Sequence, residues 1–217
     1  MYTKTVTQYS IGGYDNNFSY VVADQNTRAA AIIDPAGDIE SVLHDVKQKG
    51  CTVTAIWLTH TDKDHTEGID AILTSHPKTP IYVHRDGLEM VSHYETDSIS
   101  LEEGSEVQIG ETIFTIIETP GHTPDSICFY RQATETEPPL LVTGDTLFVG
   151  GCGKIDESSA DTMFSSLQKI KQLPDKTLVF SGHDYGTTST STLGHEKNNN
   201  PYLQATTLTE FIKKRFS

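Results

Sequence analysis

Histidine and aspartate residues gather in four polar clusters, and side chains of these two types bind metal ions. The first cluster is the densest and holds His60, Asp62, Asp64 and His65. The other three each present one such residue directly after a glycine, and these residues are His122, Asp145 and His183. Imidazole and carboxylate groups suit divalent ions, and no cysteine stands in the first cluster to supply a thiolate. The four clusters together predict a metal-dependent active site.

The spacing within the first cluster favours two ions. Alternate residues of a short polar loop can be offered to two neighbouring metals, which one face of a helix or strand could not do. Two such ions can hold a hydroxide between them and polarise a substrate oxygen, as in binuclear hydrolysis. The glycines before His122, Asp145 and His183 permit the sharp turns and close backbone approach that a crowded metal site requires.

Each cluster directly follows a predicted β-strand. Short apolar runs predict these four strands, at residues 53–58, 113–117, 140–143 and 178–180. Strand ends in α/β folds point toward a common rim, so that residues distant in sequence converge there. We therefore expect the four clusters to form one site.

The rest of the pattern predicts the elements around these strands. Alternation predicts a strand over 2–9, and the strands 18–23 and 29–34 form a hairpin. Further strands are expected at 81–84, 107–109 and 127–130. Helices are expected between Asp38 and Gly50 and over 156–173 and 203–216, and loops over 134–139 and 187–200. Hairpins interrupted by single helices are typical of a layered α/β architecture with mixed sheets.

Length and charge exclude several classes of protein. The 217 residues suffice for one substantial domain, and the net charge of −14 disfavours binding to nucleic acid or to anionic membranes. An anionic substrate would therefore need a local basic patch. Cys51, Cys128 and Cys152 lie far apart and form no disulfide framework. The sequence has neither the apolar core of a signal peptide nor a stretch that could span a bilayer, so we expect a cytoplasmic protein.

The clusters resemble motifs of the metallo-β-lactamase superfamily. They are Thr-His-Thr-Asp-Lys-Asp-His at 59–65, Thr-Pro-Gly-His-Thr at 119–123, Thr-Gly-Asp-Thr-Leu-Phe at 143–148 and Ser-Gly-His-Asp-Tyr at 181–185. The resemblance implies a single domain over 1–217 with an αββα sandwich, in which two mixed sheets pack face to face between helices. The metals would lie in a cleft at one edge. Asp34 matches an early aspartate of the family, for which we expect a supporting role rather than a ligand role.

The resemblance also implies a ligand set. The first metal would be bound by His60, position 62 and His122, and the second by Asp64, His65 and His183, with Asp145 bridging both. The family's usual motif is His-x-His-x-Asp-His, whereas this chain has Asp62 where the second histidine belongs. If Asp62 is a ligand, the site becomes harder and favours iron or manganese over zinc. Otherwise the first site loses a ligand, which leaves one metal or a degraded activity.

Within the superfamily, Gly-Gly-Cys-Gly-Lys at 150–154 resembles the glyoxalase II branch, the hydroxyacylglutathione hydrolases. In that branch the counterparts of Lys154 and Tyr185 hold glutathione, so the resemblance implies a small thiol-derived substrate such as a glutathione thioester. A metal-bound hydroxide would attack the thioester, and Asp64 could orient it as well as bind metal. Those enzymes also carry a helical C-terminal domain, for which we expect no counterpart here.

The tail of the chain resembles another branch, the persulfide dioxygenases. This resemblance rests on residues 183–185, 191–197 and 200–201. Those relatives bind one iron through two histidines and one aspartate, which match His60, His122 and Asp145, so Asp62 does not weaken this alternative. A metal-binding module without catalysis is a third alternative. We favour the thioester hydrolase because the Gly-Cys-Gly-Lys segment and the commonest chemistry of the superfamily both indicate it.

The remaining histidines match no metal motif. We expect these residues to be structural or exposed: His44, His76, His84, His93 and His195. Cys152 lies near the expected cleft, but nothing in the sequence indicates a lowered pKa for its thiol.

Overall fold

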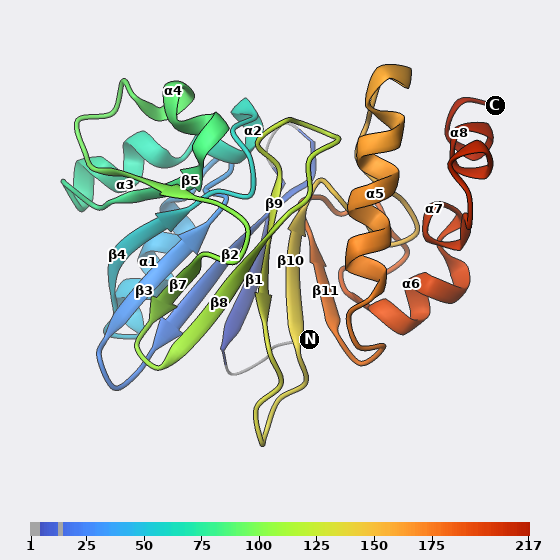
Figure 1. The fold of residues 1–217 in the computed structure, drawn as a ribbon. Helices are drawn as coiled ribbons and strands as arrows, with labels where there is room; N and C mark the ends of the chain where they lie inside the picture. The colour runs from blue at the N-terminus through green and yellow to red at the C-terminus, as the bar shows by residue number, and fades with distance from the viewer. Residues whose placement is uncertain (1–4, 13–14) are drawn as a thin grey trace.

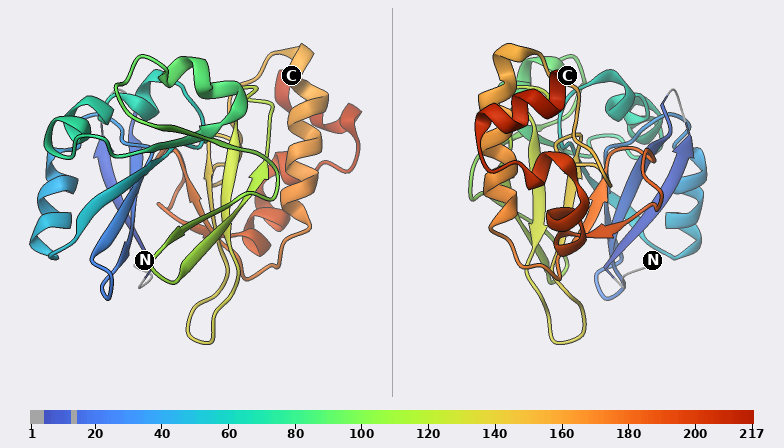
Figure 2. Two further views of the ribbon diagram at one scale, coloured as in Figure 1. Left: turned by 60° about the vertical axis from the view of Figure 1, so that its left-hand side comes forward. Right: turned by 90° about the vertical axis from the view of Figure 1, so that its right-hand side faces the viewer.

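Two six-stranded β-sheets pack face to face, with helices on their outer faces (Figure 1; Figure 2). This arrangement is seen in a computed structural model of the chain, which describes residues 5–12 and 15–217. It confirms the αββα sandwich with mixed sheets. Among the described helices, none is long and apolar enough to cross a membrane.

The first sheet is built by the N-terminal half of the chain. Its strands lie in sequence order: β1 (Val6–Gly12), β2 (Asn17–Asp24), β3 (Ala29–Ile33), β4 (Thr52–Trp57), β5 (Ile81–His84) and β6 (Ser98–Leu101). β1, β2 and β3 pair antiparallel, whereas β3 to β6 pair parallel. The predicted hairpin of β2 and β3 is therefore confirmed. The strand expected over 2–9 is observed as β1, and residues 2–4 lie outside the described residues.

The second sheet is built by the C-terminal half. Its order is β12-β11-β10-β9-β8-β7, with the bounds β7 (Glu106–Ile109), β8 (Thr112–Glu118), β9 (Ile127–Arg131), β10 (Leu140–Gly144), β11 (Leu178–Ser181) and β12 (Ser191–Thr192). β10 and β11 pair parallel, because the connection through helix α5 (Ala160–Lys171) returns the chain to the same end of the sheet. The other described neighbours in this sheet pair antiparallel.

Apolar helix faces cover the outer side of each sheet. α1 (Glu40–Gln48) and α3 (Ile69–Ser75) lie on the outer face of the first sheet, and α5 and α8 (Leu208–Phe216) on that of the second (Figure 2). Their apolar side chains are buried against these sheets. Asp38 accepts a hydrogen bond from the backbone N–H of Glu40 at 3.2 Å, although the N-cap position of α1 is Ile39. The shorter helices are α2 (Lys63–Thr66), α4 (Leu88–Val91), α6 (Leu193–Asn199), α7 (Pro201–Gln204) and the 3-10 turns Arg85–Gly87 and Glu157–Ser159.

Aromatic side chains fill the space between the two sheets. Trp57 at the end of β4 is 1% exposed and stacks on Phe129 of β9, with ring centroids 5.5 Å apart. Phe114 of β8 meets the same indole at 69°, with centroids 5.6 Å apart. Close packing of this kind fixes one sheet relative to the other, and it thereby fixes the loops at their shared edge.

Two predictions for the C-terminal part are wrong. The run 187–200 is not a loop, because it contains β12 and α6, where Thr192 accepts a hydrogen bond from the N–H of His195 at 3.2 Å. The helix expected over 203–216 is two helices, because the chain leaves helical geometry after α7 and Thr207 caps α8. Leu203 and Phe211 are buried in one cluster on either side of this break, so the apolar spacing alone did not reveal it.

Candidate metal centre

The ends of four strands bring the predicted clusters to one edge of the sandwich. The clusters follow β4, β8, β10 and β11, which all run toward the upper side of the molecule in Figure 1. Backbone hydrogen bonds of 2.8 Å join the loops directly, from Ile127 N–H to the carbonyl of Thr59 and from Gly182 N–H to that of Gly144. The four clusters therefore converge, as the positions of the strands predicted.

Potential ligand atoms form two neighbouring groups, and within each group they lie within 4.8 Å of one another. One group is His60, His122 and Asp145, and the other is Asp64, His65 and His183. Asp145 reaches both groups, since its Oδ2 lies 3.6 Å from Nε2 of His122 and 3.2 Å from Nε2 of His183. A carboxylate in this position can bind two ions at once.

Hydrogen bonds on the Nδ1 side orient two of the imidazole rings. Nδ1 of His122 donates to the carbonyl of Lys154, and Nδ1 of His183 donates to the carbonyl of Asp15, each at 2.7 Å. Because a carbonyl oxygen only accepts, the neutral form of each ring carries its proton on Nδ1. Both rings then present the lone pair of Nε2 to the centre.

Asp34 orients the other two rings. Its carboxylate accepts hydrogen bonds from the backbone N–H and the hydroxyl of Thr59, at 2.8 and 2.7 Å, and lies 3.2 Å from Nδ1 of His65. Since the hydroxyl of Thr59 donates to Asp34, its oxygen accepts from Nδ1 of His60 at 3.0 Å. Asp34 is fully buried and contacts the far side of these residues, which is the geometry of a supporting residue.

The donor atoms left at the centre fit a divalent cation. Nε2 of His60 is buried without a hydrogen-bond partner among the described residues, and Oδ1 of Asp145 has only a longer contact of 3.4 Å with Nε2 of His65. Nε2 of His65 lies 3.3 Å from Nε2 of His183, so two nitrogen lone pairs face each other when both rings are neutral. Buried polar atoms without partners are costly, and a cation bound between them would remove that cost. Nitrogen and oxygen donors without sulfur suit zinc, iron or manganese.

Asp62 lies at the rim of this centre. Its Oδ2 is 3.3 Å from Nε2 of His122 and 3.8 Å from Nε2 of His60, and its side chain is 49% exposed. It belongs to neither close group of ligand atoms. It directly precedes α2, so the first cluster is in part a helical turn rather than the loop that we expected. The carboxylate can thus approach the first group only from the solvent side.

Burial and charge set the protonation states of the centre. Burial lowers the pKa of His60 to about 4, and the neighbouring His65 adds to this shift. Burial would also lower the pKa of His65, but hydrogen bonds with Asp145 and Asp34 outweigh it and raise that pKa well above its usual value. Burial would raise the pKa of Asp145, but hydrogen bonds with His183 and His65 hold it well below its usual value. Without a cation, the ionised carboxylate of Asp145 therefore favours a proton on His65, whereas burial keeps His60 neutral near neutral pH.

Two of the glycines before ligand positions are required by close contacts. At Gly144, where φ is 47°, an added Cβ would lie 2.3 Å from Oγ1 of Thr59. At Gly182 it would lie 2.2 Å from Oδ1 of Asp145 and 2.9 Å from Cε1 of His65. The close backbone approach inferred from the sequence is confirmed at both positions.

One residue of the site could not be identified from its sequence context. Asn17 is 1% exposed, and its Nδ2 donates to Oδ2 of Asp64 at 2.9 Å. It also forms a backbone bridge with His183. An asparagine at the start of a strand gives no metal signal by itself, so only its position beside Asp64 reveals this role.

The two residues predicted to bind substrate lie beside the centre. Tyr185 is 48% exposed, and its ring stacks on the imidazole of His183 with centroids 4.8 Å apart. Its hydroxyl donates to the carboxylate of Asp15. Lys154 has an exposed side chain, while its backbone carbonyl holds His122. The ring of Tyr185 is thus exposed beside a potential ligand, whereas Lys154 contacts another through its backbone and has a solvent-exposed side chain.

Neither group of ligand atoms includes any other described histidine. His84 is buried and its Nε2 lies 3.0 Å from Oε1 of Glu118, whereas His44 hydrogen-bonds to Gln48 on the surface of α1. Cys152 is 8% exposed, and burial raises the pKa of its thiol to about 12. This thiol is therefore not a thiolate near neutral pH.

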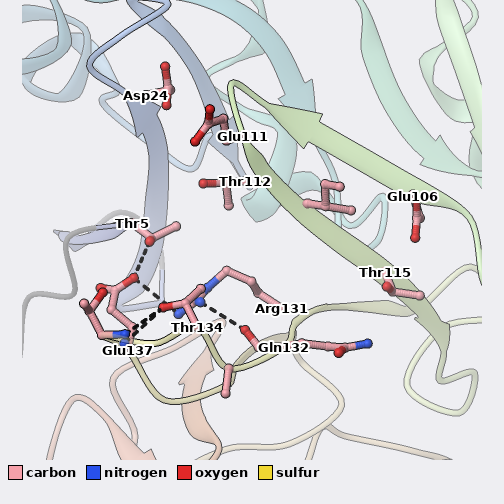
Figure 3. Close-up of a pocket in the computed structure, with 13 residues that line it drawn as sticks. Thr5, Asp24, Glu106, Glu111, Thr112, Thr115, Arg131, Gln132, Thr134 and Glu137 are labelled. Atoms are coloured by element: carbon pink, nitrogen blue, oxygen red, sulfur yellow. Dashed lines mark hydrogen bonds and ion pairs between the residues drawn. The ribbon is translucent and has the colours of Figure 1, made fainter.

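A separate cavity of about 600 Å³ lies at the opposite ends of the same strands, beside the start of β8 and the end of β9 (Figure 3). Arg131 lines it together with the carboxylates of Asp24, Glu106 and Glu111, and Nη2 of Arg131 lies 3.4 Å from Oε2 of Glu137. No histidine lines this cavity. It therefore lacks the donor set of the metal centre.

Comparisons with known proteins agree with this geometry. The model of the Metallo-beta-lactamase superfamily matches residues 12–183. A hydroxyacylglutathione hydrolase of Marinomonas sp. (strain MWYL1) is 34% identical over 83% of this chain and 66% of its own length. The chain spans just under two thirds of the length of this and similar curated relatives.

Two solved structures share the fold and part of the sequence. ETHE1 from Myxococcus xanthus has a TM-score of 0.82 and 28% identity, and the match covers 96% of this chain and 88% of that one. TTHA1623, solved in a di-iron-bound form, has a TM-score of 0.75 and 26% identity, with coverage of 91% and 100%.

Proposed function

We propose that this chain, which belongs to the metallo-beta-lactamase superfamily, is a metal-dependent hydrolase of a thioester such as a hydroxyacylglutathione. The convergence of two groups of histidine and aspartate ligand atoms around Asp145 carries this proposal. Curated relatives named hydroxyacylglutathione hydrolase, at 34% and 38% identity, support the choice of substrate class.

In this proposal the two groups of ligand atoms hold one ion each. The first ion is assigned to His60, His122 and Asp145, and the second to Asp64, His65 and His183, with Asp145 shared. Asp62 would approach the first ion from the rim. Divalent ions in these positions would polarise the thioester carbonyl and lower the pKa of a water molecule.

Asp64 is assigned a second role, which is to orient the attacking water. Its Oδ2 accepts the hydrogen bond from Asn17 and lies 3.5 Å from Nε2 of His183, so these contacts hold the carboxylate in place. A carboxylate fixed in this way can accept a proton from water with its other oxygen.

Lys154 and Tyr185 are assigned to the thiol carrier of the substrate. Their side chains are exposed beside the centre, and the ammonium group of Lys154 supplies a local positive charge on a chain whose net charge is −14. An anionic carrier such as glutathione would otherwise be repelled by this acidic protein.

One feature favours a second function, iron-dependent persulfide oxidation. His60, His122 and Asp145 form a two-histidine, one-carboxylate set that does not need Asp62. This is the ligand set of non-haem iron oxygenases. The motif at 191–201 and the similarity to ETHE1 over 96% of this chain agree with this alternative.

Metal analysis combined with two assays separates these functions. We expect protein purified without added metal to contain two ions per chain and to hydrolyse lactoylglutathione. One equivalent of iron, with O₂ uptake on glutathione persulfide, would instead support the dioxygenase. Little bound metal and no activity in either assay would contradict both functions and favour a non-catalytic module.

Replacing Asp62 with histidine should strengthen zinc binding. An imidazole at this position would add a nitrogen donor beside His122 and remove one negative charge, which makes the site softer. We expect the Kd for zinc, measured by competition with a chromophoric chelator, to fall by roughly tenfold or more. Asp70→His on the exposed side of α3 is the matched control. Unchanged zinc affinity in Asp62→His would show that this side chain does not reach the ion.

Zinc affinity should increase with pH. The pKa values of His65, His122 and His183 are raised, because nearby carboxylates outweigh the effect of burial. Zinc takes the lone pair that the proton would occupy, so binding releases protons and strengthens about tenfold per pH unit for each proton released. This increase should extend above pH 6.5, roughly the ordinary pKa of histidine. Calorimetry in two buffers of different ionisation enthalpy measures the release, and an affinity independent of pH would contradict the assignment.

A further inference from the structure

A buried carboxylate on α6 holds a turn of the chain that lies outside the ligand set. Glu196 is 1% exposed, and its Oε2 accepts hydrogen bonds from the backbone N–H of Gly150 at 2.8 Å and from Nδ2 of Asn200 at 3.1 Å. Asn200 is fully buried and also donates to the carbonyls of Phe148 and Gly151, at 3.3 and 2.9 Å. These two side chains, the Glu196–Asn200 clamp, thus hold the turn 148–151.

Among the described residues, the backbone of this turn pairs with itself and with no strand. The backbone groups of Phe148 and Gly151 hydrogen-bond to each other across the turn, N–H to carbonyl, at 3.0 and 3.2 Å. These bonds close the turn but do not attach it to the sheet. The clamp supplies hydrogen bonds that attach the turn, and they reach backbone groups of Phe148, Gly150 and Gly151.

The start of the turn contacts the second group of ligand atoms. The ring of Phe148 meets the imidazole of His183 edge-on, at 89° with centroids 5.7 Å apart. It meets the ring of Tyr185 in the same way, at 87° and 5.1 Å. Phe148 therefore supports the stacked pair of Tyr185 and His183 from one side.

The continuation of the same loop contacts the first group. The carbonyl of Lys154 accepts the hydrogen bond from Nδ1 of His122. Gly153 lies so close that an added Cβ would be 3.0 Å from Cγ of His122 and 2.1 Å from the carbonyl oxygen of Asp145. One loop, residues 148–154, therefore touches a histidine of each group.

We infer that Glu196 and Asn200 are positioning residues of the metal centre, which fix the loop 148–154 so that it orients His122 and His183 together. Oε1 of Glu196 is buried without a hydrogen-bond partner among the described residues, which lowers stability. The contacts of the other oxygen, Oε2, must therefore offset this cost. Partners that orient metal ligands from outside affect metal binding roughly 10- to 100-fold. A role limited to joining α6 and α7 would instead change stability alone.

The test compares Glu196→Leu with Glu196→Gln. Leucine fills much of the same space but accepts no hydrogen bond, whereas the amide oxygen of glutamine can still accept from the N–H of Gly150. We expect Glu196→Leu to speed hydrogen exchange of residues 148–154 in the metal-free protein and to weaken zinc binding roughly 10- to 100-fold. Glu196→Gln should stay within about threefold of the parent, because the acceptor is retained.

Lys197→Ala is the matched control on the same helix. Its Nζ contacts the carbonyl of Leu173 and the carboxylate of Asp175, at 2.8 and 2.6 Å, and not the loop. We expect a lower Tm with unchanged zinc affinity. If Glu196→Leu does not fold, Asn200→Asp replaces it, because an aspartate oxygen still caps α7 through Tyr202 N–H but cannot donate from an amide to the turn.

Two results would overturn the inference. One is that Glu196→Leu, or Asn200→Asp in its place, keeps the hydrogen-exchange rate of residues 148–154 and the zinc affinity of the parent. The other is that Lys197→Ala loses as much zinc affinity as that variant does. The inference rests on the metal site of the proposed function, and the two fail in different ways. Failure of the parent to bind zinc, iron or manganese would defeat the proposed function. Unchanged exchange of the loop in metal-free Glu196→Leu would defeat the clamp alone.

Discussion

Asp145→Asn is expected to lower kcat roughly a thousandfold, which corresponds to about 4 kcal/mol of transition-state stabilisation, and to remove most of the bound metal. The carboxylate lies within 3.6 Å of Nε2 of both His122 and His183, so its loss affects both proposed ions. Asparagine keeps the shape but carries no charge, and its NH₂ group cannot bind a cation. Metal content by mass spectrometry and the rate of thioester hydrolysis measure the two effects.

Asp125→Asn is a control of the same chemical change nearby. Asp125 is 5% exposed and accepts a hydrogen bond from the hydroxyl of Thr61 at 2.7 Å, but it belongs to neither group of ligand atoms. We expect it to lose about 1 kcal/mol of stability and to retain its metal. Full metal content in Asp145→Asn, with kcat within about tenfold of the parent, would exclude Asp145 as a shared ligand.

Gly182→Ala should damage the centre by crowding it. The new methyl group would lie 2.2 Å from Oδ1 of Asp145 and 2.9 Å from Cε1 of His65, so the carboxylate must move out of place. A displacement of this size near reacting groups can reduce activity roughly a hundredfold. Overpacking should also lower the free energy of unfolding by about 1–3 kcal/mol. Urea unfolding, metal content and kcat together separate these contributions.

Gly68→Ala reproduces the crowding against residues that are not potential ligands. Its Cβ would lie 2.9 Å from the carbonyl oxygen of Pro35 and from Cβ of Ile39. We expect a similar loss of stability with parental metal content. If both alanine variants retain metal and activity equally, the contact between Gly182 and Asp145 does not constrain the centre.

Local chemistry made much of this protein predictable from its sequence. The strands before the ligand clusters are short apolar runs. The local spacing and type of their residues predict their positions without knowledge of the tertiary contacts. The glycines at 144 and 182 signalled close approach because few other reasons place glycine directly before a potential ligand. The C-terminal helices were harder to predict, since the caps at Thr192 and Thr207 are small local effects that compete with the burial of apolar residues.

Residue type and order determined which side chains could bind a metal and which fold would gather them. The packing of the two sheets decided the rest, because distances across the sandwich depend on contacts such as that of Trp57 with Phe129, which no local pattern encodes. Those distances leave Asp62 at the rim, place Asn17 against Asp64, and set the buried Glu196 beneath a loop that reaches both halves of the centre.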